Sequence, residues 1–164
     1  MRLILTITIF FSYLLPQGTR YIDEVFDSVQ KTEDVVYGNA PDLPFLFLFE
    51  WNTYDIDLDM DIYEPVGDTL THRPVIVFAH TGSFFSGHNE LDDVVDLAIS
   101  AAKRGYVAVC INYRLGLNIL STYSAERALY RAVQDGGAAI RYLREYSDDM
   151  RINPENIFMW GTSA

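Results

Sequence analysis

The last residues of the sequence carry the clearest chemical signal. Residues 157–160 are all apolar and run directly into Gly161, Thr162, Ser163 and Ala164. An apolar strand that ends in a sharp turn with a serine at its tip forms the left part of a G-x-S-x-G nucleophile elbow. Such a turn projects the hydroxyl away from the backbone, and small neighbouring residues leave room for it to attack. The pattern therefore predicts a buried strand that presents Ser163 as a nucleophile.

A glycine-containing loop gives the second chemical signal. Residues 75–79 form a continuous apolar run, typical of a strand that is covered on both faces of a parallel sheet. The loop that follows, residues 80–88, contains Gly82 and Gly87. Glycines let a backbone approach a carbonyl oxygen and aim N–H groups at it as it becomes negative in acyl transfer. The same glycine spacing occurs in phosphate loops, but His88 stands where those loops require lysine, so a phosphate site is excluded.

This loop resembles the H-G-G-G-F loop of esterases and lipases of the α/β-hydrolase fold. His80, Gly82 and Phe84 match that loop, and Thr81 and Ser83 stand where the family usually has glycines. The shared feature is a backbone able to offer N–H groups after a buried strand.

Two further segments resemble the same family. Residues 112–116 read N-Y-R-L-G, as in carboxylesterases, and residues 132–164 are similar to the family's helix, N-P-E-N-I loop and G-x-S-A-G elbow. The resemblance covers about residues 55–164 and places three motifs in the family's order.

The resemblance implies a hydrolase that cleaves carboxylic esters of small molecules with a serine nucleophile, through an acyl-enzyme and without a cofactor or metal. By family position, Ser163 is the nucleophile, and Gly82, Ser83 and Ala164 offer the oxyanion N–H groups. His80 is assigned to holding the loop in place.

The family's triad follows the order serine, acid, histidine, so the acid and the histidine are expected beyond residue 164. The three histidines of the sequence all precede Ser163, and His72 and His88 are interpreted as loop histidines. A serine hydroxyl is a weak nucleophile until a base takes its proton. We therefore expect the chain to be the N-terminal part of a longer domain, and a fragment that ends at Ala164 to be inactive.

Two other functions stay open: a peptidase of the same fold, and a hydrolase-fold binding or adhesion module that lacks catalysis. Relatives of the second kind typically replace the serine, so Ser163 favours an enzyme. The residues that follow Ala164 would distinguish the three.

Alternation of apolar and acidic residues predicts a strand over residues 54–63, with one buried and one solvated face. The two faces consist of Ile56, Leu58, Met60 and Ile62 on one side and Asp55, Asp57, Asp59 and Asp61 on the other. A calcium loop is excluded, because Ile62 occupies the position that requires glycine.

Helical periodicity predicts helices over residues 90–104, capped by Asn89, and over residues 125–146, with Leu129 and Val133 on the buried face. A buried strand is predicted between them, at residues 106–111. This alternation predicts an α/β protein, the N-terminal half of an α/β-hydrolase domain over residues 19–164. It has a mostly parallel sheet, helices on both faces and an antiparallel entry strand.

The segment before residue 54 is less regular. Apolar spacing favours a helix over residues 21–31 and a short strand over residues 34–37. The apolar run at residues 45–49 is interpreted either as a buried strand or as an exposed lip near a substrate entrance.

Residues 1–18 are predicted to be a signal peptide, because Arg2 precedes a 13-residue apolar stretch, Leu3 to Leu15. A spanning helix needs about 20 apolar residues, so an uncleaved anchor is the alternative. The protein is therefore expected to be secreted or periplasmic, with no membrane span after signal removal.

The composition excludes several classes of partner. The net charge is −11, from 12 Lys and Arg against 23 Asp and Glu, which argues against binding nucleic acid or anionic membranes. The one cysteine, Cys110, lies in an apolar run and is interpreted as a buried strand thiol, so no disulfide framework exists. Arg114 is interpreted as a member of a structural ion pair.

Overall fold

The computed structural model describes residues 19–44 and 49–163. Three predictions fall wholly or largely outside the described residues. They are the signal peptide at residues 1–18, most of the apolar run at residues 45–49, and the oxyanion donor Ala164.

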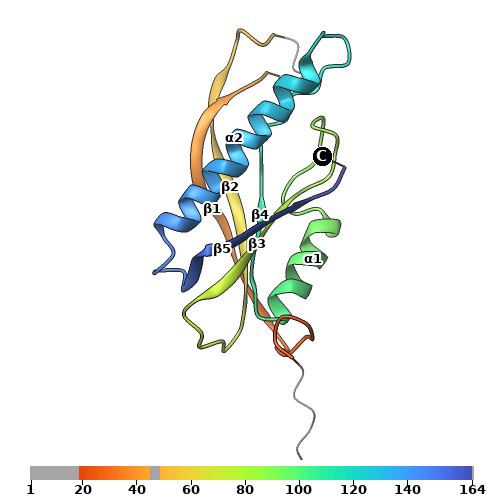
Figure 1. The fold of residues 1–164 in the computed structure, drawn as a ribbon. Coiled ribbons are helices and arrows are strands. Elements are labelled where there is room, and N and C mark those ends of the chain that lie inside the picture. Colours follow the sequence, from red (N-terminus) through yellow and green to blue (C-terminus); the bar gives the residue numbers. More distant parts are fainter. Residues whose placement is uncertain (1–18, 45–48, 164) are drawn as a thin grey trace, which may run out of the picture.

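Within the described residues, five strands form one sheet in the order β1-β2-β4-β3-β5. The strands are β1 (Val29–Asp42), β2 (Tyr54–Pro65), β3 (Arg73–Ala79), β4 (Val107–Ile111) and β5 (Ile152–Gly161). β3 runs parallel to β4 and β5, whereas β2 pairs antiparallel with both β1 and β4. The predicted parallel sheet with an antiparallel entry strand is therefore present (Figure 1).

Two helices, α1 (Asp92–Lys103) and α2 (Ser124–Glu145), cover opposite faces of this sheet. Alternate residues of β2 and β3 point to the two sides, so that Val75 and Val77 pack under α2 and Phe78 packs under α1. All five residues of β4 are buried, because β4 lies between two strands and beneath both helices.

The predicted helix over residues 21–31 is wrong. Residues 19–23 form turns, and β1 begins at Val29. The backbone N–H groups of Tyr21, Val25 and Phe26 donate to carbonyl oxygens at the C-terminal end of α1. These carbonyls have no partner inside α1, so the segment is held by the helix end instead of forming a helix of its own.

The predicted solvated face of β2 is correct only in part. Asp55 and Asp57 are exposed, but Asp61 is buried under α1, where Lys31 pairs with it at 2.9 Å. β1 contributes this lysine by pairing with the whole of β2. Burial of Asp61 is possible because the lysine compensates its charge.

The ends and faces of the helices also differ from prediction. α1 begins at Asp92 with no side-chain cap, and the N–H of Asn89 donates to the Asn112 side chain instead. On α2, Leu129 and Val133 are exposed. The buried face of α2 consists of Ser124, Ala128, Asp135, Gly136, Ala139 and Leu143.

Two predictions about single buried residues are confirmed. Cys110 is fully buried in β4, and burial raises the pKa of its thiol to about 12. Arg114 forms a buried pair with Asp135 of α2, with Nη2 and Oδ1 2.6 Å apart. The Arg114 backbone N–H also donates to the Asp135 carboxylate at 2.8 Å. This pair fixes the chain that leaves β4 against α2.

Candidate active site

Ser163 lies just after β5, at the C-terminal edge of the parallel strands. The predicted burial of this strand is wrong: β5 is an edge strand of the described sheet, and its residues Phe158, Met159 and Trp160 are 56%, 48% and 38% exposed. β5 ends at Gly161, and Ser163 has a left-handed φ of 50°. That conformation is uncommon for a residue other than glycine and is typical of a sharp turn. The side chain is exposed there, as expected for a serine at the tip of an elbow.

The predicted oxyanion loop follows β3, the strand that pairs with β5. Gly82, Ser83 and Phe84 have consecutive φ values of 133°, 54° and 54°. A Cβ atom at Gly82 would lie only 1.8 Å from the carbonyl oxygen of Ser86. Only glycine fits at this position, so the glycine of the sequence motif has a geometric cause.

Two backbone donors of this loop converge on one oxygen atom. The N–H groups of Gly82 and Ser83 donate to the carbonyl oxygen of Ser163, at N···O distances of 3.2 and 3.0 Å. Two donors aimed at a single oxygen beside a serine are what stabilisation of an oxyanion requires. The oxygen found there is the protein's own Ser163 carbonyl oxygen.

The buried side chain of His80 supports this loop. Its side chain is only 1% exposed, and its ring stacks on Tyr113 with centroids 4.3 Å apart. Its Nδ1 lies 2.8 Å from the carbonyl oxygen of Thr81, which can only accept, so Nδ1 carries the proton. The Tyr113 hydroxyl donates to the His80 carbonyl oxygen at 2.8 Å.

The environment keeps the His80 ring neutral. Burial lowers the pKa of His80 from its ordinary value. A Cβ atom at Gly87 would lie 2.3 Å from His80 Nδ1, so the second glycine of the loop makes room for the ring. Sequence reasoning missed Tyr113 and Gly87 as supports, because a stacking contact leaves no spacing signal.

No histidine in the described part of the chain hydrogen-bonds to Ser163. His80 faces Thr81 and Tyr113, His72 contacts Thr71 on the surface, and His88 accepts from the backbone of Glu90. Among the described residues, Ser163, Gly82 and Ser83 thus lie together, and none of the three histidines is hydrogen-bonded to the serine.

Residues 19–44 and 49–163 contain no cluster of three or more His, Cys, Asp or Glu side chains able to hold a metal ion. Neither described helix has the length and apolar character needed to cross a membrane.

Comparisons with known proteins agree with this geometry. Residues 60–164 match the family model named BD-FAE. Over 94 residues the chain is 30% identical to para-nitrobenzyl esterase of Bacillus subtilis strain 168, covering 56% of this chain and 19% of that protein. Over 93 residues it is 32% identical to mouse neuroligin-2, covering 56% of this chain and 11% of that protein. The chain thus spans about a tenth to a fifth of the length of these curated relatives.

A solved structure shows the same arrangement of elements. It is a thermophilic esterase from the Planctomycetes species Thermogutta terrifontis with butyrate bound, 27% identical with a TM-score of 0.52. The similarity covers 65% of this chain and 36% of that chain.

Proposed function

Since the chain belongs to the BD-FAE family, we propose that the complete protein is a serine esterase that hydrolyses carboxylic esters through an acyl-enzyme. Its sheet and helices have the α/β-hydrolase fold of the esterases to which it is similar. The single observation that carries the proposal is the convergence of the Gly82 and Ser83 N–H groups on one oxygen at the Ser163 turn.

In this scheme the Ser163 oxygen bonds to the carbonyl carbon of the ester, and its proton passes to a general base. The carbonyl oxygen becomes negative in the position now held by the Ser163 carbonyl, where Gly82 and Ser83 donate to it. The bond to the alcohol oxygen then breaks, and the alcohol takes the proton. Water repeats the sequence on the acyl-enzyme and releases the carboxylic acid.

The remaining residues take supporting roles in the same proposal. Ala164 adds a third N–H donor by family position. His80 acts as a positioning residue, because it contacts Tyr113 and the loop and not Ser163. The acid and the base of the triad are assigned to residues beyond Ala164. This assignment is supported by the contacts of His72 and His88, which lie with Thr71 and Glu90 and not with Ser163.

We also propose that residues 1–18 are a cleaved signal peptide and that residues 19–164 belong to the hydrolase domain of an extracytoplasmic protein. The contacts of the first described residues support this boundary. Arg20 pairs with Asp68, and Tyr21 donates to the carbonyl of Arg104, so the packed domain includes residues immediately after position 18.

A specific observation keeps a binding module as the second candidate. Neuroligin-2, a protein whose name states no enzymatic activity, is as similar to this chain as the para-nitrobenzyl esterase is. A binding module would bind a partner without turnover, and its Ser163 would be dispensable.

The test is hydrolysis of p-nitrophenyl butyrate by the complete protein, a choice guided by the butyrate bound in the similar esterase. Ser163→Ala should lower turnover by about 10⁴-fold or more, because the nucleophile is lost while the fold remains. The adjacent residue, Thr162, also carries a hydroxyl, and Thr162→Ala is the matched control that should retain turnover. An equal rate in Ser163→Ala and the parent protein would favour the binding module.

A further inference from the structure

Residues 113–117, here called the post-β4 segment, leave the sheet after β4 and include most of the N-Y-R-L-G motif. β4 pairs in parallel with β3, so the two strands end at the same edge of the sheet. The post-β4 segment therefore lies beside the oxyanion loop, residues 80–87, which follows β3. Both strands are inside the sheet, with β2 on one side of the pair and β5 on the other.

The post-β4 segment holds the carbonyl group at the start of the oxyanion loop. The Tyr113 hydroxyl donates to the carbonyl oxygen of His80 at 2.8 Å. Tyr113 is only 5% exposed, and its ring lies nearly parallel to the His80 ring, with 15° between their planes. The hydrogen bond is buried, so deletion of the hydroxyl would take a donor from a carbonyl oxygen that water does not reach.

The same segment holds a second carbonyl group, directly after the two oxyanion donors. The N–H groups of Gly116 and Leu117 donate to the carbonyl oxygen of Phe84 at 2.7 and 2.9 Å. The Phe84 ring also meets the Tyr113 ring edge-on, with centroids 6.1 Å apart. The two oxyanion donors thus lie between two carbonyl groups, those of His80 and Phe84, that the post-β4 segment holds.

The oxyanion loop needs such support because its backbone is strained at the donors. Gly82, Ser83 and Phe84 all have positive φ values, and two of these residues are not glycine. A strained conformation of this kind persists only where the surrounding contacts determine it strongly. The bonds to the carbonyl groups on either side of the donors provide contacts of that kind.

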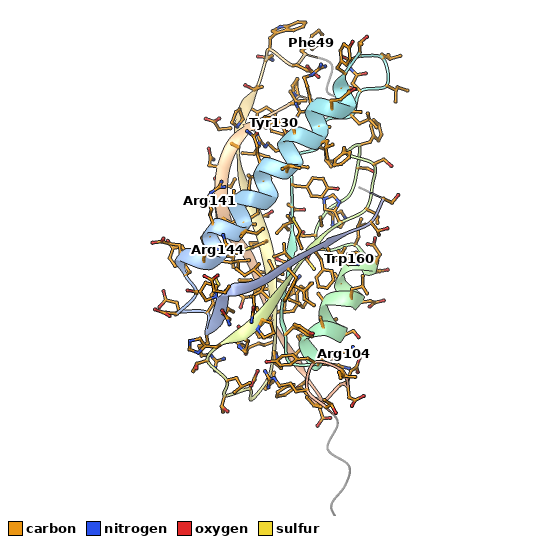
Figure 2. The ribbon with its side chains drawn as sticks, in the orientation of Figure 1. Phe49, Arg104, Tyr130, Arg141, Arg144 and Trp160 are labelled. Atoms are coloured by element: carbon orange, nitrogen blue, oxygen red, sulfur yellow. The ribbon has the colours of Figure 1, made fainter. Side chains whose placement is uncertain are left out.

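β5 approaches the oxyanion loop from another side. Trp160, near the end of β5, packs on Phe78 with ring centroids 5.7 Å apart. Phe78 belongs to the core under α1, and Figure 2 shows Trp160 beside that helix. Tyr113 and Phe84 pack instead in the core under α2. The two held carbonyl groups are therefore fixed from the β4 side, whereas Ser163 meets the loop through its own carbonyl oxygen.

We infer that the post-β4 segment fixes the oxyanion loop in its active conformation, with Tyr113 as a positioning residue for the Gly82 and Ser83 N–H groups. This inference rests on the proposed function, in which those groups donate to a developing negative charge. Tyr113 acts through His80 and Phe84 and not on the ester itself. Well-aimed donors stabilise the transition state more than the bound ester, so misplaced donors should lower kcat and leave KM nearly unchanged.

The test is hydrolysis of p-nitrophenyl butyrate by the complete protein carrying Tyr113→Phe, which deletes the hydroxyl and keeps the stacked ring. We expect kcat to fall by about ten-fold, with KM changed by less than about two-fold. The matched control is Tyr37→Phe. Tyr37 is 6% exposed, and its hydroxyl also donates to a backbone carbonyl, that of Asn112, which lies outside the oxyanion loop. The control should lose a similar amount of stability in urea and retain its kcat.

A second measurement monitors the oxyanion loop without catalysis. Hydrogen exchange at the backbone amides of residues 82–86 should become about ten-fold faster in Tyr113→Phe and stay unchanged in Tyr37→Phe. Absence of turnover by the parent protein would defeat the proposed esterase function, while amide exchange would still report on the post-β4 segment. Equal amide exchange in the two variants would overturn the inference, and so would equal kcat values.

Discussion

The frame of the molecule and the two loops that bear the site are built in opposite ways. In the frame, which comprises β3, β4 and the two helices, apolar side chains of regular strands and helices are packed on both faces of the sheet. In the loops, 80–87 and 161–163, the backbone is left-handed at Ser83, Phe84 and Ser163, each costing about 1 kcal/mol or more. The frame therefore supplies the stability that holds the loops in a strained arrangement.

This contrast separates the effects of substitutions. A change in the frame should lower the free energy of unfolding and leave the chemistry of the folded molecule intact. A change in the loops should lower turnover and affect unfolding less than a change in the frame does. The following experiments test that separation.

The largest effect is expected in the frame, at the pair that joins the end of β4 to α2. Arg114→Met leaves the Asp135 carboxylate buried without its guanidinium partner. We expect a loss of about 3–5 kcal/mol in the free energy of unfolding, measured with urea. The double variant Arg114→Met/Asp135→Leu removes both charges and should recover most of that loss. If the single variant loses less than about 1 kcal/mol, the pair does not secure the frame.

The next effect is expected in the oxyanion loop. Gly82→Val should lower kcat by about 10² to 10³-fold, because the side chain collides with the Ser86 carbonyl and displaces an N–H donor. Gly67→Val is the matched control. Gly67 also has a positive φ, of 81°, but no atom lies within 4 Å of its added Cβ. Similar kcat values for the two variants would show that Gly82 has no part in catalysis.

A smaller effect is expected from His80, which couples the loop to pH. The pKa of His80 is lowered in the folded protein. Just below pH 6.5, the ordinary pKa of histidine, the unfolded chain therefore binds a proton at His80 more readily than the folded protein does. The stability contribution of neutral His80 is therefore complete above about pH 6.5 and is lost as the pH falls below it. We expect His80→Asn to reduce the slope of unfolding free energy against pH in this range by up to about 1.4 kcal/mol per unit. An unaltered slope would mean that the pKa of His80 is the same in the folded and unfolded states.

The sequence predicted the frame well where one local pattern determined each element. β3 and β4 are continuous apolar runs because both faces of a parallel sheet are covered, and the alternation in β2 reports its position between core and surface. Prediction failed where a residue that is distant in the sequence determines whether a side chain is buried. Asp61 is buried because Lys31 pairs with it. On α2, Asp135 faces inward because it pairs with Arg114, and Leu129 and Val133 are therefore on the exposed side of the helix.

The sequence motifs predicted which residues form the candidate site, but they predicted only part of its geometry. Gly82 and Ser163 were predicted because an elbow and an oxyanion loop require particular residue types in a particular order. The support of His80 by Tyr113 depends on the pairing of β3 with β4, and the meeting of the Gly82 and Ser83 N–H groups at one oxygen depends on the pairing of β3 with β5. No local pattern encodes these pairings.

The most direct test of the acyl-transfer site is a crystal structure of the complete protein after reaction with a p-nitrophenyl alkylphosphonate ester. The phosphonyl group imitates the tetrahedral intermediate once serine has displaced p-nitrophenolate. We predict a covalent bond from phosphorus to the Ser163 oxygen, with the phosphonyl oxygen about 2.7–3.1 Å from the nitrogens of both Gly82 and Ser83. The carbonyl oxygen of Ser163 should have left that position. An adduct at another residue, or a phosphonyl oxygen directed away from both N–H groups, would contradict the account.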